Sequence, residues 1–523
     1  MKFIFILLIS FLNYFPARKS LKAAEKINIQ FEEMSIPISI EQLSNFSTNK
    51  YNSNEVTEWF TQNGFNRFFE LSKYLEFPIF KEGGLTRQIL RSWIGRRVLS
   101  ELSNTIIVPN DLNGVEVFNT IENLLDTKEE ISTLEILRAI PTKEINLDLD
   151  NLILIIASWK RELAQHQKLI SKLNEYEALD KKYIFKESKD SEDSKEDIEP
   201  IKKELSVLHR SSPLLIEIWK PINTNSDKDL IILMPGLGGD ISNFRWIANK
   251  LSKEGWPILF IDHQGTNSEA LLKVIKGDEV LPGGADVFLY RIKDLNAVIT
   301  AHRNGSFLSG NKSYILMGHS LGSLISFLYA GNLPEKGFEK RCENALTDLA
   351  ITNLSKLLQC QLSEISLPYF KELSSNLKAL IGFNSFGSIA WPTDKSSGIS
   401  TPVLFLGGTY DLITPLLSEQ FKVFLSTSSN PLNRFLVVEG ASHFAPIRLS
   451  TKKVDKKEDI FQINKNFVGS NPFEVQNLSV KVIIEFLNSL EKGKGLDLVK
   501  NQNENKLNFH ILDAIEIKKF MEN

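Results

Sequence analysis

The chain has almost no surplus charge of either sign, since its 523 residues include 61 Lys and Arg against 64 Asp and Glu. No strong field would therefore draw it to nucleic acid or to an anionic surface, and we do not expect nucleic acid as a partner. Beyond its N-terminus it also lacks any apolar stretch long and uncharged enough to cross a membrane. Hydrophobic residues make up 42% of the chain, which is typical of a protein that folds around a buried core.

Two kinds of sequence signature are missing as well. No repeat of solenoid period is present. A glycine-rich loop in "ILMPGLGGD", residues 232–240, ends without G-K-[ST] and lacks the spacing G-x-G-x-x-G, so nucleotide binding is a weak interpretation. We expect no metal and no organic cofactor. The length predicts roughly two to four domains, or one large domain with an additional module.

The N-terminus is the exception to the lack of apolar runs. It reads "MKFIFILLISFLNYFPARKSLKAAEK", with Lys2, an apolar run from Phe3 to Phe15 and then a polar, alanine-bearing region. That order is typical of a secretory signal, and the run is shorter than the about 20 residues that span a bilayer. We predict that residues 1–24 direct export to a periplasm or lumen. The cleavage site is poor, so the alternative is an uncleaved segment that associates the protein with a membrane.

Cysteine is scarce, because Cys342 and Cys360 are the only two. In an oxidising compartment such a pair is more naturally a disulfide than two unrelated thiols. The alternative is two buried thiols that pack as small hydrophobic side chains. The choice between these interpretations depends on export.

The pattern of apolar residues divides the chain into segments. Residues 25–185 show mostly spacings of three and four, as in "NLILIIASWKRELAQHQKLISKL", which predicts a mainly α-helical N-terminal domain. Residues 186–200, "KESKDSEDSKEDIEP", predict an exposed linker. In residues 201–490 short β-branched and apolar runs alternate with helical stretches, which predicts an α/β domain with a doubly wound, mostly parallel sheet. Residues 491–523 are expected to form a polar C-terminal tail.

A candidate nucleophile lies in "GHSLGS", residues 318–323, between the apolar run "YILM" and the helical pattern "LISFLYAG". The motif G-x-S-x-G is common by chance, but this strand-turn-helix setting is what a nucleophile elbow requires. Gly318 and Gly322 permit a tight turn that lifts the Ser320 hydroxyl above the sheet. The Leu321 N–H, at the start of the helix, would then stabilise an oxyanion. The alternative is a surface serine in a glycine-rich turn.

A serine nucleophile needs a base, and the chain has only seven histidines. His443 in "LVVEGASHFAP" follows the last apolar strand and is the predicted base. Asp411 in "PVLFLGGTYDLITP" follows another strand end, and the chain order Ser, Asp, His favours it as the acid. The alternatives are that Asp411 is a turn aspartate bonded to its own backbone, or that Asp394 in "WPTDK" is the acid. The other histidines lie outside the core pattern, in a polar loop or before the acid in chain order: His166, His209, His263, His302, His319 and His510.

The second oxyanion donor is expected from the loop after the strand that precedes the first core helix. The stretch "PGLGGD" fits, because Gly236, Gly238 and Gly239 let backbone N–H groups converge, and Leu237 N–H is the expected donor. Residues 333–380, with the apolar "LTDLAITNLSKLLQCQLSEISL", predict a helical lid that shapes an apolar acyl pocket.

Together these residues resemble the α/β-hydrolase superfamily, and within it the exported hydrolases related to predicted dienelactone hydrolases and platelet-activating-factor acetylhydrolases. From about residue 25 to 490 the chain resembles a cyanobacterial branch with a helical N-terminal domain of unknown function. The matching segments are "LTRQILRSWIGRRVLSELSNTI", "STLEILRAIPTKEINLDL", "PGLGGDISNFRWIANKLSKEGWPILFIDHQGTNSEA", "GHSLGS", "NLSKLLQC", "GTYDLITPLLSEQ" and "EGASHFAP".

The sequence departs from this family's pattern at three places. Pro235 stands where the family usually has histidine, and "RIKD" at 291–294 stands where it tends to have Arg-Pro-x-Asp. After the strand that follows the nucleophile, where the acetylhydrolase branch carries its acid, lies Asn384, which again favours Asp411. The branch also places cysteines in the insertion after the nucleophile helix, and this resemblance favours the disulfide.

The residues and the resemblance predict a hydrolase that cleaves a carboxylic ester, with a hydrophobic small molecule or a lipid as substrate. Ser320 would attack, His443 would act as general base and then acid, and Asp411 would orient the imidazole. Two alternatives remain. One is an acyltransferase that uses the same triad, and the other is a non-catalytic binding protein that keeps the fold.

Overall fold

The computed structural model describes residues 24–31, 33–47, 78–81, 103–109, 111, 114–125, 127–128, 130–175, 185, 198–221, 228–267, 269–270, 285–308, 312–330, 334–347, 353–366, 376–392, 399–427, 430–447 and 470–521. Contacts divide the chain into two compact units, Met1–Ala157 and Ser158–Asn523. The division falls inside helix α9 (Leu149–Glu175). Almost all of the predicted signal or anchor segment lies outside the described residues.

The first unit contains a four-stranded sheet in the order β2-β1-β6-β4. Strand β1 pairs antiparallel with β2 and parallel with β6, and β4 pairs antiparallel with β6. Strands β3 and β5 form a separate antiparallel pair. The elements are β1 (Lys26–Phe31), β2 (Met34–Ser39), α2 (Ile40–Ser47), β3 (Pro78–Lys81), β4 (Ile106–Ile107), α7 (Val115–Leu125), β5 (Glu130–Ser132), α8 (Thr133–Ala139) and β6 (Glu144–Asp148).

The described residues of the predicted mainly helical N-terminal domain contain short strands as well as helices. Strand β1 buries Ile27 and Ile29 at alternate positions, a period of two that marks a half-buried strand. The strands of this unit are short, so apolar spacings of three and four residues, which are typical of helices, are more frequent in its sequence than the spacing of two. The stretch "NLILIIASWKRELAQHQKLISKL", which carries the helical spacing, lies within α9. Residues 48–77 and 82–102 lie outside the described residues.

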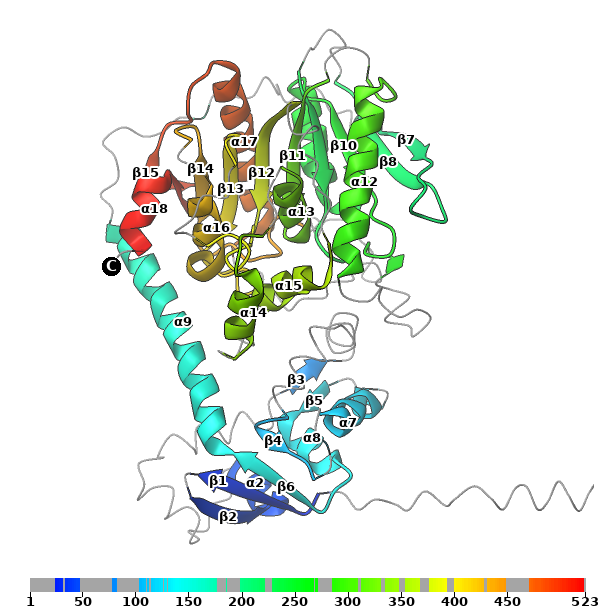
Figure 1. Cartoon of the computed structure of the whole chain (residues 1–523). Coiled ribbons are helices and arrows are strands. Elements are labelled where there is room, and N and C mark those ends of the chain that lie inside the picture. The colour runs from blue at the N-terminus through cyan, green and yellow to red at the C-terminus, as the bar shows by residue number, and fades with distance from the viewer. Residues whose placement is uncertain are drawn as a thin grey trace, which may run out of the picture. The chain divides into compact units, whose positions relative to one another are not determined.

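The second unit contains a ten-stranded sheet in the order β15-β16-β14-β13-β12-β11-β9-β10-β8-β7 (Figure 1). The strands from β14 to β10 in this order pair parallel, and the flanking strands pair antiparallel. This confirms the predicted doubly wound, mostly parallel sheet. The strands are β7 (Ile201–Leu205), β8 (Leu214–Trp219), β9 (Leu230–Met234), β10 (Ile258–Ile261), β11 (Tyr314–His319), β12 (Leu377–Phe383), β13 (Val403–Gly408), β14 (Arg434–Val438), β15 (Val499–Glu504) and β16 (Leu507–Leu512).

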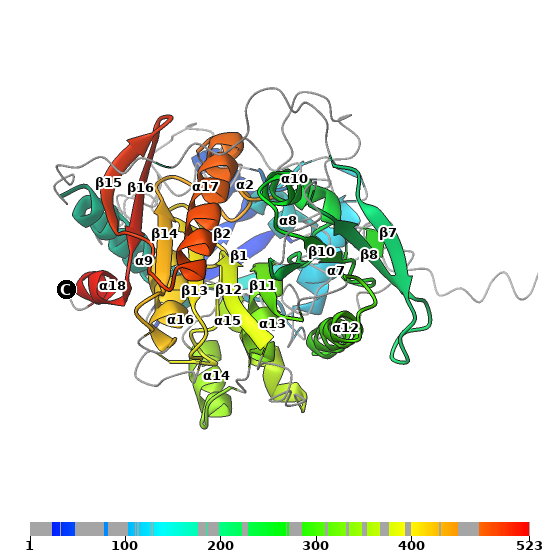
Figure 2. The ribbon, with the colours of Figure 1, turned by 90° about the horizontal axis from the view of Figure 1, so that it is seen from above.

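Helices cover both faces of this sheet, as Figure 2 shows. Helices α10 (Arg245–Lys253) and α17 (Pro472–Glu491) pack on one face through residues such as Leu251 and Ile483. Helices α12 (Asp286–Arg303), α13 (Leu321–Tyr329) and α16 (Phe421–Ser426) pack on the other through residues such as Phe288, Leu324 and Phe424. Burial on both faces explains why the central strands are apolar throughout.

The C-terminal residues are not a polar tail, because β15 and β16 extend the sheet and α18 (Ala514–Met521) packs beside them. Strand β16 pairs antiparallel with β14 and buries Leu507, Phe509 and Ile511. The second half of α9 also contributes Leu169 and Leu173 to a core of this unit. The second unit therefore begins at Ser158, within α9. The sequence predicts the boundary later in the chain, at the charged run 186–200.

The insertion after α13 is mainly helical where it is described, although β12 begins at Leu377, inside the predicted lid 333–380. It contains α14 (Phe338–Thr347), α15 (Leu354–Cys360) and the short η3 (Gln361–Glu364). A disulfide joins Cys342 in α14 to Cys360 in α15, with the two Cα atoms 5.5 Å apart. Across the described part of the chain, no helix has both the length and the apolar character needed to span a bilayer.

Candidate active site

Parallel strands bring the three predicted triad residues to the same edge of the sheet. Ser320 directly follows β11, Asp411 follows β13 and His443 follows β14. Because these strands are parallel, their carboxyl ends lie side by side. Residues far apart in the sequence are thereby gathered at one edge.

Ser320 occupies a strained turn between β11 and α13. Its backbone angles are φ 52° and ψ −117°, which non-glycine residues rarely adopt. A Cβ atom at Gly322 would collide with the carbonyls of Met234 and Pro235, and one at Gly318 would collide with the Gly322 backbone. The turn therefore needs glycine at both positions, and strain of this kind is typical of a functional residue.

His443 and Asp411 form a buried pair. His443 Nδ1 lies 3.0 Å from Asp411 Oδ2 and 3.2 Å from Oδ1. Burial by itself would raise the pKa of Asp411, but the charge and hydrogen bond of His443 and the hydrogen bonds from Thr414 lower it below its ordinary value. The carboxylate therefore accepts a hydrogen bond from Nδ1–H of His443, so Nε2 is the ring nitrogen that does not face Asp411.

Several hydrogen-bond donors outside the predicted triad hold this carboxylate. Thr414 donates to Asp411 from both its hydroxyl (2.6 Å) and its N–H (2.8 Å), and Ile413 N–H donates at 2.9 Å. Asn384 Nδ2 (2.7 Å) and Gln420 Nε2 (3.0 Å) also donate to Oδ2. A carboxylate with so many donors has a fixed orientation, and it fixes the imidazole in turn.

His319, the residue before Ser320, contacts the backbone of His443. Its Nε2 lies 3.0 Å from the His443 carbonyl oxygen, and the two ring centroids are 4.9 Å apart. Burial and the neighbouring His443 lower the pKa of His319 to about 3. The ring is therefore neutral near pH 7 and donates from Nε2. This contact ties the turn that carries Ser320 to the loop that carries His443.

The expected oxyanion loop lies next to this turn. A Cβ atom at Gly236 would come within 2.9 Å of His319 Nδ1 and 3.3 Å of Ser320 Cβ, so the loop backbone lies against the serine. Gly238 has φ 70°, which favours glycine, and its N–H donates to Thr266 O at 2.8 Å. Within the described residues, neither Leu237 N–H nor Leu321 N–H has an intramolecular acceptor.

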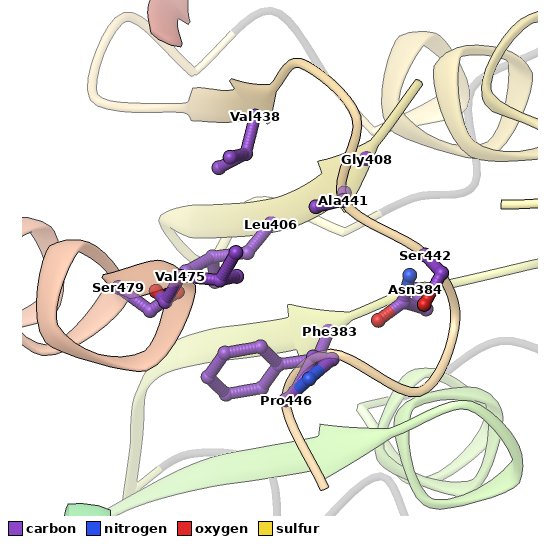
Figure 3. A pocket seen from close by; sticks show the side chains of 11 residues that line it. Phe383, Asn384, Leu406, Gly408, Val438, Ala441, Ser442, Pro446, Val475 and Ser479 are labelled. Carbon is purple, nitrogen blue, oxygen red and sulfur yellow. The ribbon is translucent and has the colours of Figure 1, made fainter. Parts of the chain in front are cut away.

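A small cavity borders the acid and base loops (Figure 3). Asn384 and Ser442 line one end, and apolar side chains such as Leu406 and Val475, together with Ser479, line the rest. Its volume of about 10 Å³ is that of roughly one water molecule. It is therefore too small to accept an acyl chain.

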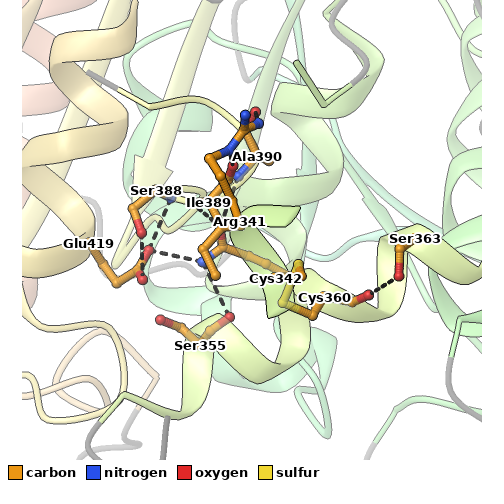
Figure 4. The surroundings of a disulfide bond; sticks show 10 residues. Arg341, Cys342, Ser355, Cys360, Ser363, Ser388, Ile389, Ala390 and Glu419 are labelled. Carbon is orange, nitrogen blue, oxygen red and sulfur yellow. Dashed lines mark hydrogen bonds between the residues drawn. A yellow bond between two sulfur atoms is a disulfide. The ribbon is translucent and has the colours of Figure 1, made fainter. Parts of the chain in front are cut away.

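A buried glutamate joins the predicted lid to the element that follows Asp411. Glu419, in η5 (Leu416–Gln420), accepts hydrogen bonds from Asn353 Nδ2 and Gln359 Nε2 of the lid, each at 3.0 Å. It also accepts from the hydroxyl (2.8 Å) and N–H (3.1 Å) of Ser388 (Figure 4). The Cys342–Cys360 disulfide lies beside this network. The lid is thus fastened at the carboxyl edge of the sheet.

The structure places the remaining sequence candidates elsewhere or leaves them out. His166 forms a hydrogen bond with Thr409 O, His302 with Ser313 O, and His510 with the Glu439 side chain. Asp394 lies outside the described residues. In the described part of the chain, no three His, Cys, Asp or Glu side chains are grouped to hold a metal ion.

A second polar cluster surrounds Asp294 on α12. This buried carboxylate accepts from Arg210 Nε and Nη2 at 2.6 Å each, from His209 at 2.7 Å and from His263 Nδ1 at 2.8 Å. Burial, followed by the charge of Arg291, lowers the pKa of His263 to about 4. His263 is therefore a neutral donor in the folded protein near pH 7.

Acid is expected to destabilise the protein partly through His263. Below pH 6.5 the unfolded chain protonates this histidine, whereas the folded protein does not until about pH 4. The contribution of neutral His263 to the free energy of unfolding is complete above pH 6.5. It is lost as the pH falls from 6.5 to about 4, and the total loss is about 3 kcal/mol. In urea unfolding at pH 7 and pH 4, His263→Asn should lose less stability between the two values than wild type. Equal losses would contradict this assignment.

Two family models match the chain. One, described as an alpha/beta hydrolase of unknown function (DUF1400), matches residues 23–148. The other, described as serine aminopeptidase, S33, matches residues 225–340, which include the loop with Gly236 and the turn with Ser320. No curated protein matches the chain.

Proposed function

Since the chain belongs to the α/β-hydrolase superfamily, we propose that it is a serine hydrolase that cleaves a hydrophobic carboxylic ester. The observation that carries the proposal is the strained Ser320 turn at the same sheet edge as the buried Asp411–His443 pair. The contact of His319 with the His443 backbone supports it further, because it holds the two loops together.

The proposed reaction has two stages. Ser320 Oγ attacks the ester carbonyl while His443 Nε2 takes its proton, and the oxyanion accepts from Leu237 and Leu321 N–H. The proton then passes to the leaving alkoxide, which departs as the alcohol and leaves an acyl-serine. In the second stage His443 deprotonates a water molecule that attacks this ester, and the carboxylic acid and free Ser320 are released.

An apolar substrate is favoured by the side chains around these groups. Leu237 on the oxyanion loop and Tyr410 and Leu412 on either side of Asp411 are exposed. Such side chains beside a polar catalytic centre suit an acyl chain or another apolar group.

A second candidate is a peptidase, favoured by the match to the serine aminopeptidase model. The same nucleophile and base can attack an amide carbonyl. The two candidates differ in the leaving group, which is an alcohol for an esterase and an amine for a peptidase.

A substrate panel separates these candidates. Nitrophenyl esters of rising acyl length and aminoacyl nitroanilides would be offered to wild type and to Ser320→Ala. Ester turnover that rises with acyl length and disappears in the variant supports the proposal, whereas faster anilide turnover would replace the esterase with a peptidase. Turnover of neither class by wild type would contradict both.

We also propose that the protein is exported, with residues 1–24 as a signal or membrane anchor. The Cys342–Cys360 disulfide supports this, because disulfides persist mainly in oxidising compartments. A fusion of residues 1–24 to a reporter that is active only after export would test the proposal. A reporter that stays inside the cell would contradict it.

Reduction of the disulfide is expected to change acyl-length selectivity more than overall stability. The bond spans a sequence separation of 18, for which loop-closure entropy gives about 3 kcal/mol. Glu419 still fastens α15 when the bond is broken, so the lid should loosen without detaching. Rates across the ester series would be compared for wild type and the double variant Cys342→Ser, Cys360→Ser. An unchanged ratio of long-chain to short-chain rates would contradict a role for the lid in selectivity.

A further inference from the structure

A buried arginine on α12 holds the loop that carries the expected oxyanion donor. Arg291 is only 1% exposed. Its Nη1 donates to Pro235 O at 2.6 Å and its Nη2 donates to Gly236 O at 2.9 Å. Its Nε donates to Thr266 Oγ1 at 3.0 Å. Thr266 O in turn accepts from Gly238 N–H, so Arg291 contacts this loop directly and through Thr266.

The bond to Gly236 O determines where Leu237 N–H points. The Gly236 carbonyl and the Leu237 N–H belong to one planar trans peptide unit, in which the C=O and N–H bonds point in opposite directions. A guanidinium that fixes the carbonyl on one side therefore fixes the N–H on the other. The same loop backbone lies against Ser320, where a Cβ atom at Gly236 would come 3.3 Å from Ser320 Cβ.

Arg291 is not explained as a partner of a carboxylate. Among the described residues no carboxylate oxygen lies within ion-pair distance of it, and nearby Asp294 is bonded by Arg210, His209 and His263. Burial lowers the pKa of Arg291 to about 9, so the side chain is still a cation at neutral pH. Burial of a cation is costly unless the cation is hydrogen-bonded. The hydrogen bonds of Arg291 go to loop oxygens, two of them successive carbonyls, so a role in holding this loop explains its burial.

We propose that Arg291 is a positioning residue of the oxyanion hole, which orients Leu237 N–H toward the oxygen that becomes negative. This inference rests on the proposed serine hydrolase function. Loss of one oxyanion donor typically lowers kcat by about 100-fold to 1,000-fold. Because removal of Arg291 would displace the donor rather than delete it, the expected loss is about 100-fold in kcat, with KM little changed.

The chain offers a matched control in Arg210. It is also a largely buried arginine of this region and bonds Asp294 and Gln264 O, but it has no contact with Pro235 or Gly236. Arg210→Met should lower thermal stability while leaving kcat within about threefold of wild type, since the oxyanion loop keeps its donors. Arg291→Met and Arg291→Lys test the proposal itself, the lysine variant as one that retains the cation and can reach one carbonyl.

The experiment measures kcat and KM for a nitrophenyl ester, and the affinity for an alkyl trifluoromethyl ketone that forms an oxyanion on a catalytic serine. We expect Arg291→Met to lose about 100-fold in kcat and a similar factor in ketone affinity, and Arg291→Lys to recover part of both. A purely structural role would lower the amount of folded enzyme without changing the ratio of ketone affinity to KM per folded molecule. If Arg291→Met does not fold, the lysine variant must still show a selective loss of ketone affinity.

Two outcomes would overturn the inference alone: a folded Arg291→Met with kcat and ketone affinity within threefold of wild type, or equal losses in Arg210→Met. A lysine variant with wild-type ketone affinity would do the same where the methionine variant is unfolded. Wild-type protein that neither turns over esters nor reacts at Ser320 with a fluorophosphonate would overturn the proposed function, and this inference with it.

Discussion

Ser320→Ala is expected to abolish ester turnover, with kcat lower by about five powers of ten or more. The variant should fold normally, because the Ser320 side chain makes no hydrogen bond within the described structure and alanine fits the same space. Turnover of the most reactive nitrophenyl ester, together with the thermal unfolding temperature, measures both expectations. Ser323→Ala is the matched control, since this serine lies on the same helix and bonds Ser385 Oγ instead.

A different result for Ser320→Ala would change the account of the site. Turnover within tenfold of wild type would mean that the serine in the strained turn is not the nucleophile. Equal losses in Ser320→Ala and Ser323→Ala would point to damage to the turn rather than to loss of a reacting oxygen.

Asp411→Asn is expected to lower kcat by about four powers of ten. The asparagine amide would face His443 Nδ1 with a donor in place of an acceptor, and the imidazole would then favour the tautomer that carries its proton on Nε2. That tautomer cannot take the proton of Ser320. The measurement is kcat for a nitrophenyl ester in Asp411→Asn and in Asp394→Asn, which should change little.

The surroundings of Asp411 predict a cost in stability as well. Thr414, Asn384 and Gln420 all donate to this carboxylate, so an amide nitrogen placed there would face donors. A net loss of about 1–3 kcal/mol in the free energy of unfolding is expected. Should Asp394→Asn prove the more damaging of the two for kcat, the acid would have to be assigned to Asp394.

The sheet and the edge where the site lies could be predicted from the sequence. The central strands are buried on both faces, so they appear as uninterrupted apolar runs such as "YILM" and "VLFL". Polar residues that come soon after such runs must lie at the carboxyl edge of the sheet, and this predicts the position of Ser320, Asp411 and His443. The glycines of the Ser320 turn could be predicted for the same local reason.

The groups that orient these residues could not be predicted in this way. Thr414 and Gln420 are ordinary polar residues in a loop and a helical turn, and nothing in their spacing shows that they converge on Asp411. Arg291 is separated from Gly236 by more than 50 positions in the sequence, and only the packing of α12 brings them together. Contacts of this kind depend on tertiary structure and leave no periodic pattern.

The C-terminal strands were missed for a different reason. In "LNFHIL" the buried Leu507, Phe509 and Ile511 alternate with Asn508 and His510, a period of two within an otherwise polar segment. His510 is itself buried, because it bonds Glu439. The polar residues thus concealed a strand whose alternation was present in the sequence.

The central claim, that Ser320 is a nucleophile activated by His443, is tested most directly by mapping the site of covalent labelling. Wild-type protein would be treated with a fluorophosphonate, digested and sequenced by mass spectrometry. We expect a single labelled peptide that contains "GHSLGS" with the phosphonyl group on Ser320, and labelling at least 1,000-fold slower in His443→Ala, on the order of the loss that follows removal of a triad base. A label on another residue, or none on Ser320 in the wild-type protein, would contradict the account.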